Sequence, residues 1–117
     1  MRDGLCDAVA LPAVLMRLRW QPGRQGTGYR KLLLAQGQRW DLYVLDYPPG
    51  TSIPTHTDPV PGRRHWRVNL RVWGQDAFEG DAVLRVGPLV VFRSDVMPHG
   101  VSTVHRRRVL VSFGLAV

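Results

Sequence analysis

The sequence predicts a mainly β protein, and three observations carry that prediction. Short segments rich in Val, Leu, Trp and Tyr recur along most of the 117 residues, which is the composition that strands prefer. Gly, Pro, Asp or Asn stand in most of the gaps between these segments, as expected for turns. Helical periodicity is scarce after residue 20. Many short strands at regular spacing indicate a sandwich or a closed double sheet.

The N-terminal part has a different pattern. Asp7 to Trp20 carry apolar residues at helical spacing, which predicts one short helix, provided that Pro12 lies in its first turn. Gln21 to Tyr29 are rich in Gly and Pro, which is typical of a loop. The expected strands are Lys31–Gln36, Trp40–Tyr47, Trp66–Trp73, Ala82–Val86, Leu89–Phe92, Val101–Val104 and Arg108–Val117.

Length and composition indicate one folded domain over residues 1–117, with helix and loop in 1–30 and the β core in 31–117. A hydrophobic content of 44% with 21% charged residues argues against disorder. The single cysteine, Cys6, excludes an internal disulfide and fits a reducing compartment. Since no window approaches about 18 uncharged apolar residues and no signal peptide stands out, we expect a cytoplasmic protein that does not enter membranes.

The net charge of +7 favours acidic partners such as nucleic acid or anionic metabolites. Much of the excess lies in two runs, Arg63-Arg64 and Arg106-Arg107-Arg108. Runs this short are more often solvated edges than nucleic-acid grooves. Charge therefore indicates the sign of a partner but not its identity.

A metal site is predicted from three residues. His56 and Asp58 stand two positions apart, and residues i and i+2 of an extended segment project from the same face. His99, in the Pro98-His99-Gly100 turn, is the natural third ligand. Two histidines and one carboxylate leave open positions on the metal, an arrangement that suits non-haem Fe(II) and oxygen chemistry. A lone His-x-Asp pair is more often a turn hydrogen bond, but here it stands where a strand runs into a Pro-rich loop, where rigid folds display reactive groups.

An anion site is predicted on the last strand. Alternation from Arg108 onward places Arg108, Leu110 and Ser112 on one face. An inward guanidinium suits a bidentate grip on a carboxylate, and a buried arginine without an anion is costly. Arg106 shares the face of Arg108 and remains its rival, whereas Arg107 has the opposite parity.

Other polar residues leave alternatives open. His65 and His105 stand in basic surroundings that disfavour a cation, so neither is chosen as a ligand. Arg67 and Asn69 alternate with apolar neighbours, and the sequence does not decide whether they or those neighbours face the pocket. The tryptophans are assigned to packing; they are Trp20, Trp40, Trp66 and Trp73.

These motifs together resemble one known family, the 2-oxoglutarate oxygenases of the prolyl hydroxylase type. The likeness covers roughly residues 40 to 117. It joins Tyr47-Pro48-Pro49-Gly50, His56-Thr57-Asp58, Pro98-His99-Gly100-Val101 and Arg108, which stands nine residues after His99. Members of that family fold as a double-stranded β-helix, or jelly roll. Two departures are the helical layer, reduced to one short helix, and the Gly-Gly of the middle strands, which is present only as Glu79-Gly80.

The resemblance implies an Fe(II)- and 2-oxoglutarate-dependent dioxygenase. The iron ligands would be His56, Asp58 and His99. Arg108 would pair with the far carboxylate of 2-oxoglutarate, with Tyr47 or Ser112 as hydrogen-bond donors. Turnover would yield succinate and CO2 with hydroxylation of a small molecule, a protein side chain or a nucleobase.

Two other interpretations stay open, and so does the oligomeric state. A cupin-like metal-binding protein would not use 2-oxoglutarate, and Arg108 would be incidental to it. A basic nucleic-acid-binding module would function through its charge. A reduced helical layer leaves apolar surface exposed, which favours self-association, for instance as a homodimer.

Overall fold

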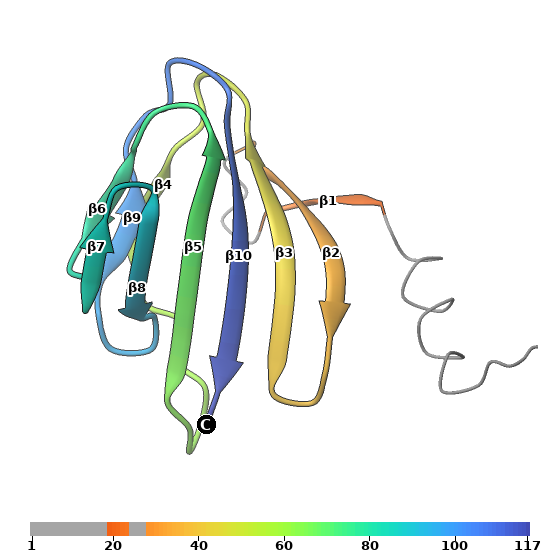
Figure 1. Ribbon diagram of the computed structural model, residues 1–117, viewed down its shortest axis with the longest axis vertical. Coiled ribbons are helices and arrows are strands. Elements are labelled where there is room, and N and C mark those ends of the chain that lie inside the picture. The colour runs from red at the N-terminus through yellow and green to blue at the C-terminus, as the bar shows by residue number, and fades with distance from the viewer. Residues whose placement is uncertain (1–18, 24–27) are drawn as a thin grey trace, which may run out of the picture.

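The computed structural model describes residues 19–23 and 28–117, and their strands form two sheets that face each other (Figure 1). The larger sheet has the order β1-β2-β3-β10-β5-β8-β7, and the smaller has the order β4-β9-β6. The strands are β1 Trp20–Pro22, β2 Arg30–Gln36, β3 Trp40–Tyr47, β4 Ile53–His56, β5 His65–Trp73, β6 Phe78–Gly80, β7 Leu84–Val86, β8 Leu89–Arg93, β9 His99–Val101 and β10 Arg108–Ala116.

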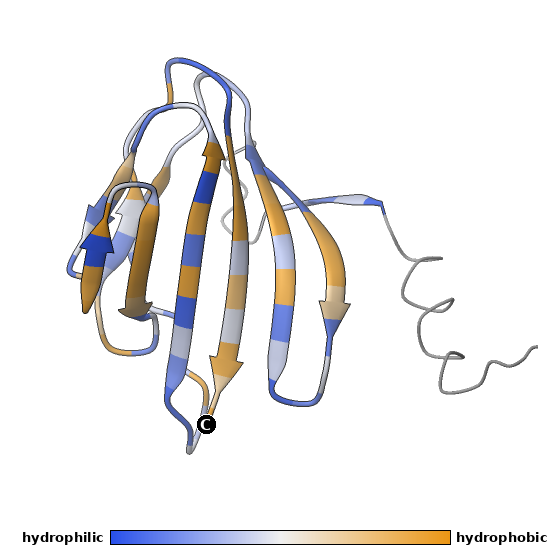
Figure 2. Cartoon of the chain, in the orientation of Figure 1, coloured by the Kyte–Doolittle hydropathy of each residue, from blue (hydrophilic) through white to orange (hydrophobic). Residues whose placement is uncertain are grey.

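Three long antiparallel strands, β3, β10 and β5, form the middle of the larger sheet. Apolar and polar residues alternate along β5 (Figure 2), so its two faces differ in character. In the register of the sheet, Ser112 on β10 lies opposite Tyr43 on β3 and Asn69 on β5. Buried and half-buried residues alternate along β10, which places Arg108, Leu110, Ser112 and Gly114 on the face that looks toward the smaller sheet.

The smaller sheet is built tightly around β9. His56 at the end of β4 pairs with His99 at the start of β9, and Gly80 on β6 pairs with His99 from the other side. Gly80 has φ +123°, and a Cβ there would lie 2.9 Å from the Cα of His99. Glycine is therefore required at this position, both for its backbone conformation and for the close approach to β9.

The core consists of two clusters of buried residues. Tyr29, Tyr47, Ile53, Val101, Val104 and Leu110 form one cluster, and Phe78, Val90 and Phe92 form the other. Residues of both clusters line the same cavity. The core thus supplies apolar walls to the pocket described below.

The predicted β class is confirmed, and so are most strands, but several bounds differ. Trp20–Pro22 pairs with β2 as strand β1, where the sequence predicts the end of a helix and the start of a loop. The expected strand Val101–Val104 is in fact β9, His99–Val101, because pairing with β4 and β6 fixes its position. Strand β6 was not predicted, since Phe78–Gly80 is too short to show a period.

The rest of the predicted helix, residues 7–18, lies outside the described residues, among which no helix is present. Consistently, no helix in the described ranges is long and apolar enough to cross a membrane.

Assigning all the tryptophans to packing was wrong. Trp73 is 67% exposed, and Trp20 and Trp40 are about 40% exposed. Only Trp66 is half-buried, with the guanidinium of Arg93 over its ring. The outer face of the larger sheet is largely apolar along β5 and β10, so aromatic residues fit there without entering the core.

Candidate metal centre

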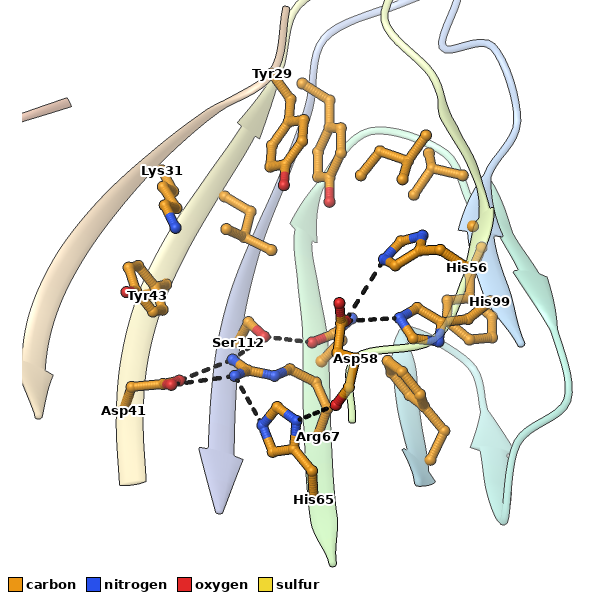
Figure 3. A pocket seen from close by; sticks show the side chains of 18 residues that line it. Tyr29, Lys31, Asp41, Tyr43, His56, Asp58, His65, Arg67, His99 and Ser112 are labelled. Atoms are coloured by element: carbon orange, nitrogen blue, oxygen red, sulfur yellow. Dashed lines mark hydrogen bonds and ion pairs between the residues drawn. The ribbon is translucent and has the colours of Figure 1, made fainter. Parts of the chain in front are cut away.

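The three predicted metal ligands converge (Figure 3). Asp58, in the loop after β4, places Oδ2 3.2 Å from His99 Nε2 and 3.5 Å from His56 Nε2. The imidazole rings of the two histidines lie 4.5 Å apart. His99 is buried, whereas the side chains of His56 and Asp58 are about one-fifth exposed, so the group is reachable from one side only.

Backbone carbonyls fix the tautomer of both histidines. His56 Nδ1 lies 2.8 Å from the carbonyl oxygen of Pro54, and His99 Nδ1 lies 2.8 Å from that of Met97. A carbonyl oxygen only accepts, so each Nδ1 carries the proton and donates. The lone pair of each neutral imidazole is then on Nε2, which faces the Asp58 carboxylate. This is the arrangement that orients a metal-binding histidine.

The donor set fits a metal ion. Two imidazole lone pairs and a carboxylate oxygen face one another, and such acceptors are stable together only with a cation among them, either a proton or a metal. Ligand atoms about 2.1 Å from one metal ion, at angles of about 90–110°, lie about 3.0–3.4 Å apart. The observed 3.2 and 3.5 Å match that spacing. His56, Asp58 and His99 therefore form a group that could hold a metal ion.

Neighbouring residues hold the three side chains in place. The backbone N–H of Asp58 donates to the carbonyl oxygen of Ser94 over 2.7 Å, and the ring of Phe92 packs against His99 at 4.7 Å. In the loop that leads to His99, Arg93 donates two hydrogen bonds of 2.8 and 2.7 Å to Asp95. These bonds hold the pKa of Asp95 at about 2. These contacts support the segments that carry Asp58 and His99.

A cavity of about 210 Å³ lies between the sheets and contains the three ligands in its wall. This is smaller than the roughly 300–1,000 Å³ of sites for drug-sized ligands. Its lining residues are Tyr29, Lys31, Asp41, Tyr43, Leu45, Tyr47, Ile53, His56, Asp58, His65, Arg67, Asn69, Phe78, Phe92, His99, Gly100, Val101 and Ser112. A small metabolite, or one projecting side chain of a larger molecule, fits this volume.

Arg108 lies beside the cavity but does not line it. Its guanidinium lies 4.9 Å from the centre of the Tyr47 ring, which does line the cavity. Arg108 is only 3% exposed, and its Nε and Nη1 atoms have no hydrogen-bond partner. Burial lowers the pKa of Arg108 and raises that of Tyr47, so Tyr47 stays a neutral donor. Unpaired buried N–H groups on an arginine are costly and indicate that an acceptor is missing.

Arg67 and Asn69 face inward, which settles the alternative that the sequence leaves open. Arg67 lies between Asp41 and His65 (Figure 3). Its Nη1 lies 2.9 Å from Asp41 Oδ1, and its Nη2 donates to His65 Nε2 over 3.4 Å. Burial, together with the charge of Arg67, lowers the pKa of His65, so this imidazole is neutral near pH 7.

Several cavity residues were missed by sequence reasoning. His65 was set aside for its basic surroundings, yet it shares the strand face of Arg67 and Asn69, and that parity was the available signal. The wall residues Lys31, Asp41 and Tyr43 gave no signal of their own. Outside the cavity, Arg106 and His105 are exposed. Of the two arginines considered for the anion site, Arg106 and Arg108, only Arg108 is buried.

Comparisons with known proteins establish the fold. No protein-family model matches the sequence, and no curated protein matches it either. Solved structures do match. An RmlC-like cupin from Shewanella frigidimarina shares 16% identity over 86% of this chain and 85% of its own, with a TM-score of 0.64. A prolyl-4-hydroxylase from Pseudomonas putida shares 18% identity over 92% and 82%, with a TM-score of 0.65. The chain has the cupin fold.

Within that fold the neighbours differ in chemistry. A predicted oxalate decarboxylase from Thermotoga maritima also matches, with 10% identity over 87% of this chain and 96% of its own and a TM-score of 0.65. At such identities a likeness shows the fold alone. The predicted double-stranded β-helix is confirmed, while the reaction has to be argued from the site.

Proposed function

We propose that this chain is an Fe(II)- and 2-oxoglutarate-dependent dioxygenase that hydroxylates a small molecule or a protein side chain. The observation that carries the proposal is the buried guanidinium of Arg108, whose Nε and Nη1 lack acceptors, beside a cavity that holds a His-Asp-His group in its wall. A dicarboxylate that binds the metal at one end and reaches Arg108 at the other would satisfy both features.

The metal end of the cavity suits this ligand. His56, Asp58 and His99 would hold the metal, and a set of three protein ligands would leave coordination positions for a co-substrate. Iron and 2-oxoglutarate, when bound, supply the oxygen chemistry, with decarboxylation to succinate and CO2 coupled to hydroxylation. The chain holds the ligands in one tautomer and excludes water with apolar walls, namely Ile53, Phe78, Phe92 and Val101.

The Tyr47 end suits a carboxylate. Tyr47 is buried and neutral, so its hydroxyl can donate, and Arg108 next to it offers two N–H nitrogens without partners. A planar guanidinium binds a carboxylate through paired hydrogen bonds. Ser112 lies further along the same face of β10, within the cavity wall, but its hydroxyl already donates to Asn69. We therefore assign the carboxylate to Arg108 and Tyr47.

Anaerobic titration with Fe(II) and then 2-oxoglutarate tests the proposal. The wild-type protein should bind one iron and develop the weak visible absorption band of the iron–2-oxoglutarate complex, and should form succinate once oxygen is admitted. His99→Ala should lose both the band and succinate formation. Iron uptake by the wild type without the band would refute the use of 2-oxoglutarate.

A second candidate is a cupin-like metal protein that binds its substrate directly to the metal. One observation favours it: Arg108 does not line the cavity, so a ligand of the metal need not contact it. This candidate predicts that the protein takes up metal and that other small carboxylates bind at this metal as well as 2-oxoglutarate does. It also predicts that the affinity for these ligands does not depend on Arg108.

A further inference from the structure

Asn69 is the only asparagine in the 117 residues, and it stands in an unusual place. It occupies the middle of β5, on the face that lines the cavity. Its neighbours across the sheet are Ser112 on β10 and the buried Val90 on β8. Asparagine is depleted in strands, and an inward-facing amide must find partners for its polar atoms. Residues that break a local rule in this way are concentrated at functional sites.

A chain of hydrogen bonds fixes the orientation of the Asn69 amide. Arg67 is held by Asp41 and donates from Nη1 to Ser112 Oγ over 3.0 Å. Ser112 Oγ in turn donates to Asn69 Oδ1 over 2.6 Å. The Ser112 side chain is fully buried, so its hydroxyl proton needs an acceptor. If the amide were flipped, Ser112 Oγ would face two donors, Arg67 Nη1 and Asn69 Nδ2, and its own hydroxyl proton would have no acceptor. The relay therefore keeps the carbonyl oxygen of Asn69 toward Ser112.

Gly114 makes this relay sterically possible. It lies on β10 directly between Asp41 on β3 and Arg67 on β5. A Cβ at this position would overlap Nη2 of Arg67 and lie 2.8 Å from Asp41 Oδ1. Without a side chain there, the guanidinium of Arg67 can cross β10 and reach Asp41.

We infer that Asn69 is a ligand-binding residue whose amide N–H groups bind a carboxylate oxygen of the molecule in the cavity, with Arg67 and Ser112 as positioning residues. Once Oδ1 is bound to Ser112, the Nδ2 atom is left with two donors, and the described residues supply no hydrogen bond to it. The cavity wall carries Lys31 and Asp58 as well as the Arg67–Asp41 pair, so its own charges balance. A divalent metal held by the His-Asp-His group would make the site net positive. An anionic acceptor is therefore preferred to a neutral carbonyl.

The inference rests on the proposed function only in placing a ligand in the cavity beside the metal centre. Its test therefore reports on Asn69 separately from the proposed dioxygenase activity. Protein labelled with [15N]asparagine should show one backbone amide and one side-chain NH2 pair, both from Asn69, because no other asparagine exists. The probes are 2-oxoglutarate and acetate, added to the Zn²⁺-loaded protein and to the metal-free protein.

The expected result is a saturable shift of the Asn69 NH2 pair on addition of 2-oxoglutarate, which would identify the co-substrate as the carboxylate source. A shift that appears only when acetate is added to the 2-oxoglutarate complex would support the inference with a second molecule, the substrate, as the source. If neither probe moves the NH2 pair while the Asn69 backbone amide shifts, the inference is overturned. Zinc uptake is measured independently, so failure of the metal centre is not confused with failure of this residue.

Variants give a second readout. Asn69→Asp replaces the donor by a carboxylate of the same shape and should weaken 2-oxoglutarate binding by about tenfold to a hundredfold. Gln75→Glu makes the same chemical exchange on an exposed residue and should leave affinity unchanged. Ser112→Ala removes the relay and should both shift the Asn69 NH2 pair and weaken binding. Equal affinity of Asn69→Asp and wild type for both 2-oxoglutarate and acetate would overturn the inference.

Discussion

Replacing Arg108 by methionine should raise the stability of the ligand-free protein while it removes binding of 2-oxoglutarate. Each buried N–H group without a partner costs about 1–3 kcal/mol, and Arg108 has two nitrogens in this state. The contact of its guanidinium with the Tyr47 ring returns about 0.5–2 kcal/mol. Methionine has a similar length and no polar atoms, so the substitution should stabilise the fold by about 1–3 kcal/mol.

Thermal unfolding measures both effects. For a domain of this size, 1 kcal/mol corresponds to about 3–5 °C in Tm, so Arg108→Met should unfold about 3–15 °C above wild type without ligand. At 2-oxoglutarate concentrations of about 100 times its Kd, wild type should gain about 2.7 kcal/mol. Losing two charge-assisted hydrogen bonds should weaken binding about a hundredfold or more, which leaves the variant a gain of about 0.4 kcal/mol or less.

The two results must occur together. Arg106→Met is the matched control, because Arg106 is exposed, and it should alter neither Tm nor the effect of the ligand. A variant Arg108→Met that unfolds below wild type, or that keeps the full 2-oxoglutarate effect, would refute the reasoning. Arg108 would then be a structural residue and the anion site would lie elsewhere.

Three further predictions concern the metal, the relay and pH. Zn²⁺ should raise the Tm of wild type but not of His99→Ala, since metal binding stabilises only the folded state. Gly114→Ala should destabilise the fold by about 1–3 kcal/mol by overpacking against Arg67, and the double variant with Arg67→Ala should cost less than the two changes added together. The pKa of Asp95 is lowered from 3.8 to about 2, so the ionised carboxylate contributes fully to the free energy of unfolding above about pH 4, and this contribution is lost as the pH falls toward 2. Asp95→Asn should abolish this pH-dependent loss of stability, which is on the order of 1 kcal/mol.

Each of these can be contradicted directly. An equal rise in Tm with Zn²⁺ for wild type and His99→Ala would place the metal elsewhere. Strict additivity of the Gly114 and Arg67 substitutions in denaturant unfolding would show that the two residues do not compete for space. An unchanged slope of stability against pH in Asp95→Asn would assign the acid transition to other carboxylates.

Features that depend on neighbouring residues could be predicted from the sequence. The period of two in β10 placed Arg108 and Ser112 on one face, and the structure buries both. The His-x-Asp pair, followed by a Pro-rich loop, marked a strand end, and β4 does end at His56. These features depend on residues within a few positions of one another, for which backbone geometry fixes the direction of each side chain.

The choice of inner face required the tertiary structure. Alternation along β5 divides its residues into a mainly polar set and an apolar set, but an apolar set can pack in a core and a polar set can line a binding pocket, so the sequence could not decide which set faces inward. Pairing of β5 between β10 and β8 turned Arg67 and Asn69 inward and brought Asp41 within reach of Arg67 across Gly114. A register shift between β5 and β10 pairs Trp73 with Val109, and this could not be foreseen from the alternation along β5; Trp73 is exposed. By itself the sequence determined the strand class, the three candidate ligands and a pair of candidate arginines, Arg106 and Arg108, because these follow from local periodicity and side-chain chemistry. The burial of Arg108 and the walls of the cavity were decided only by the tertiary structure, because they depend on strands that meet from distant parts of the chain.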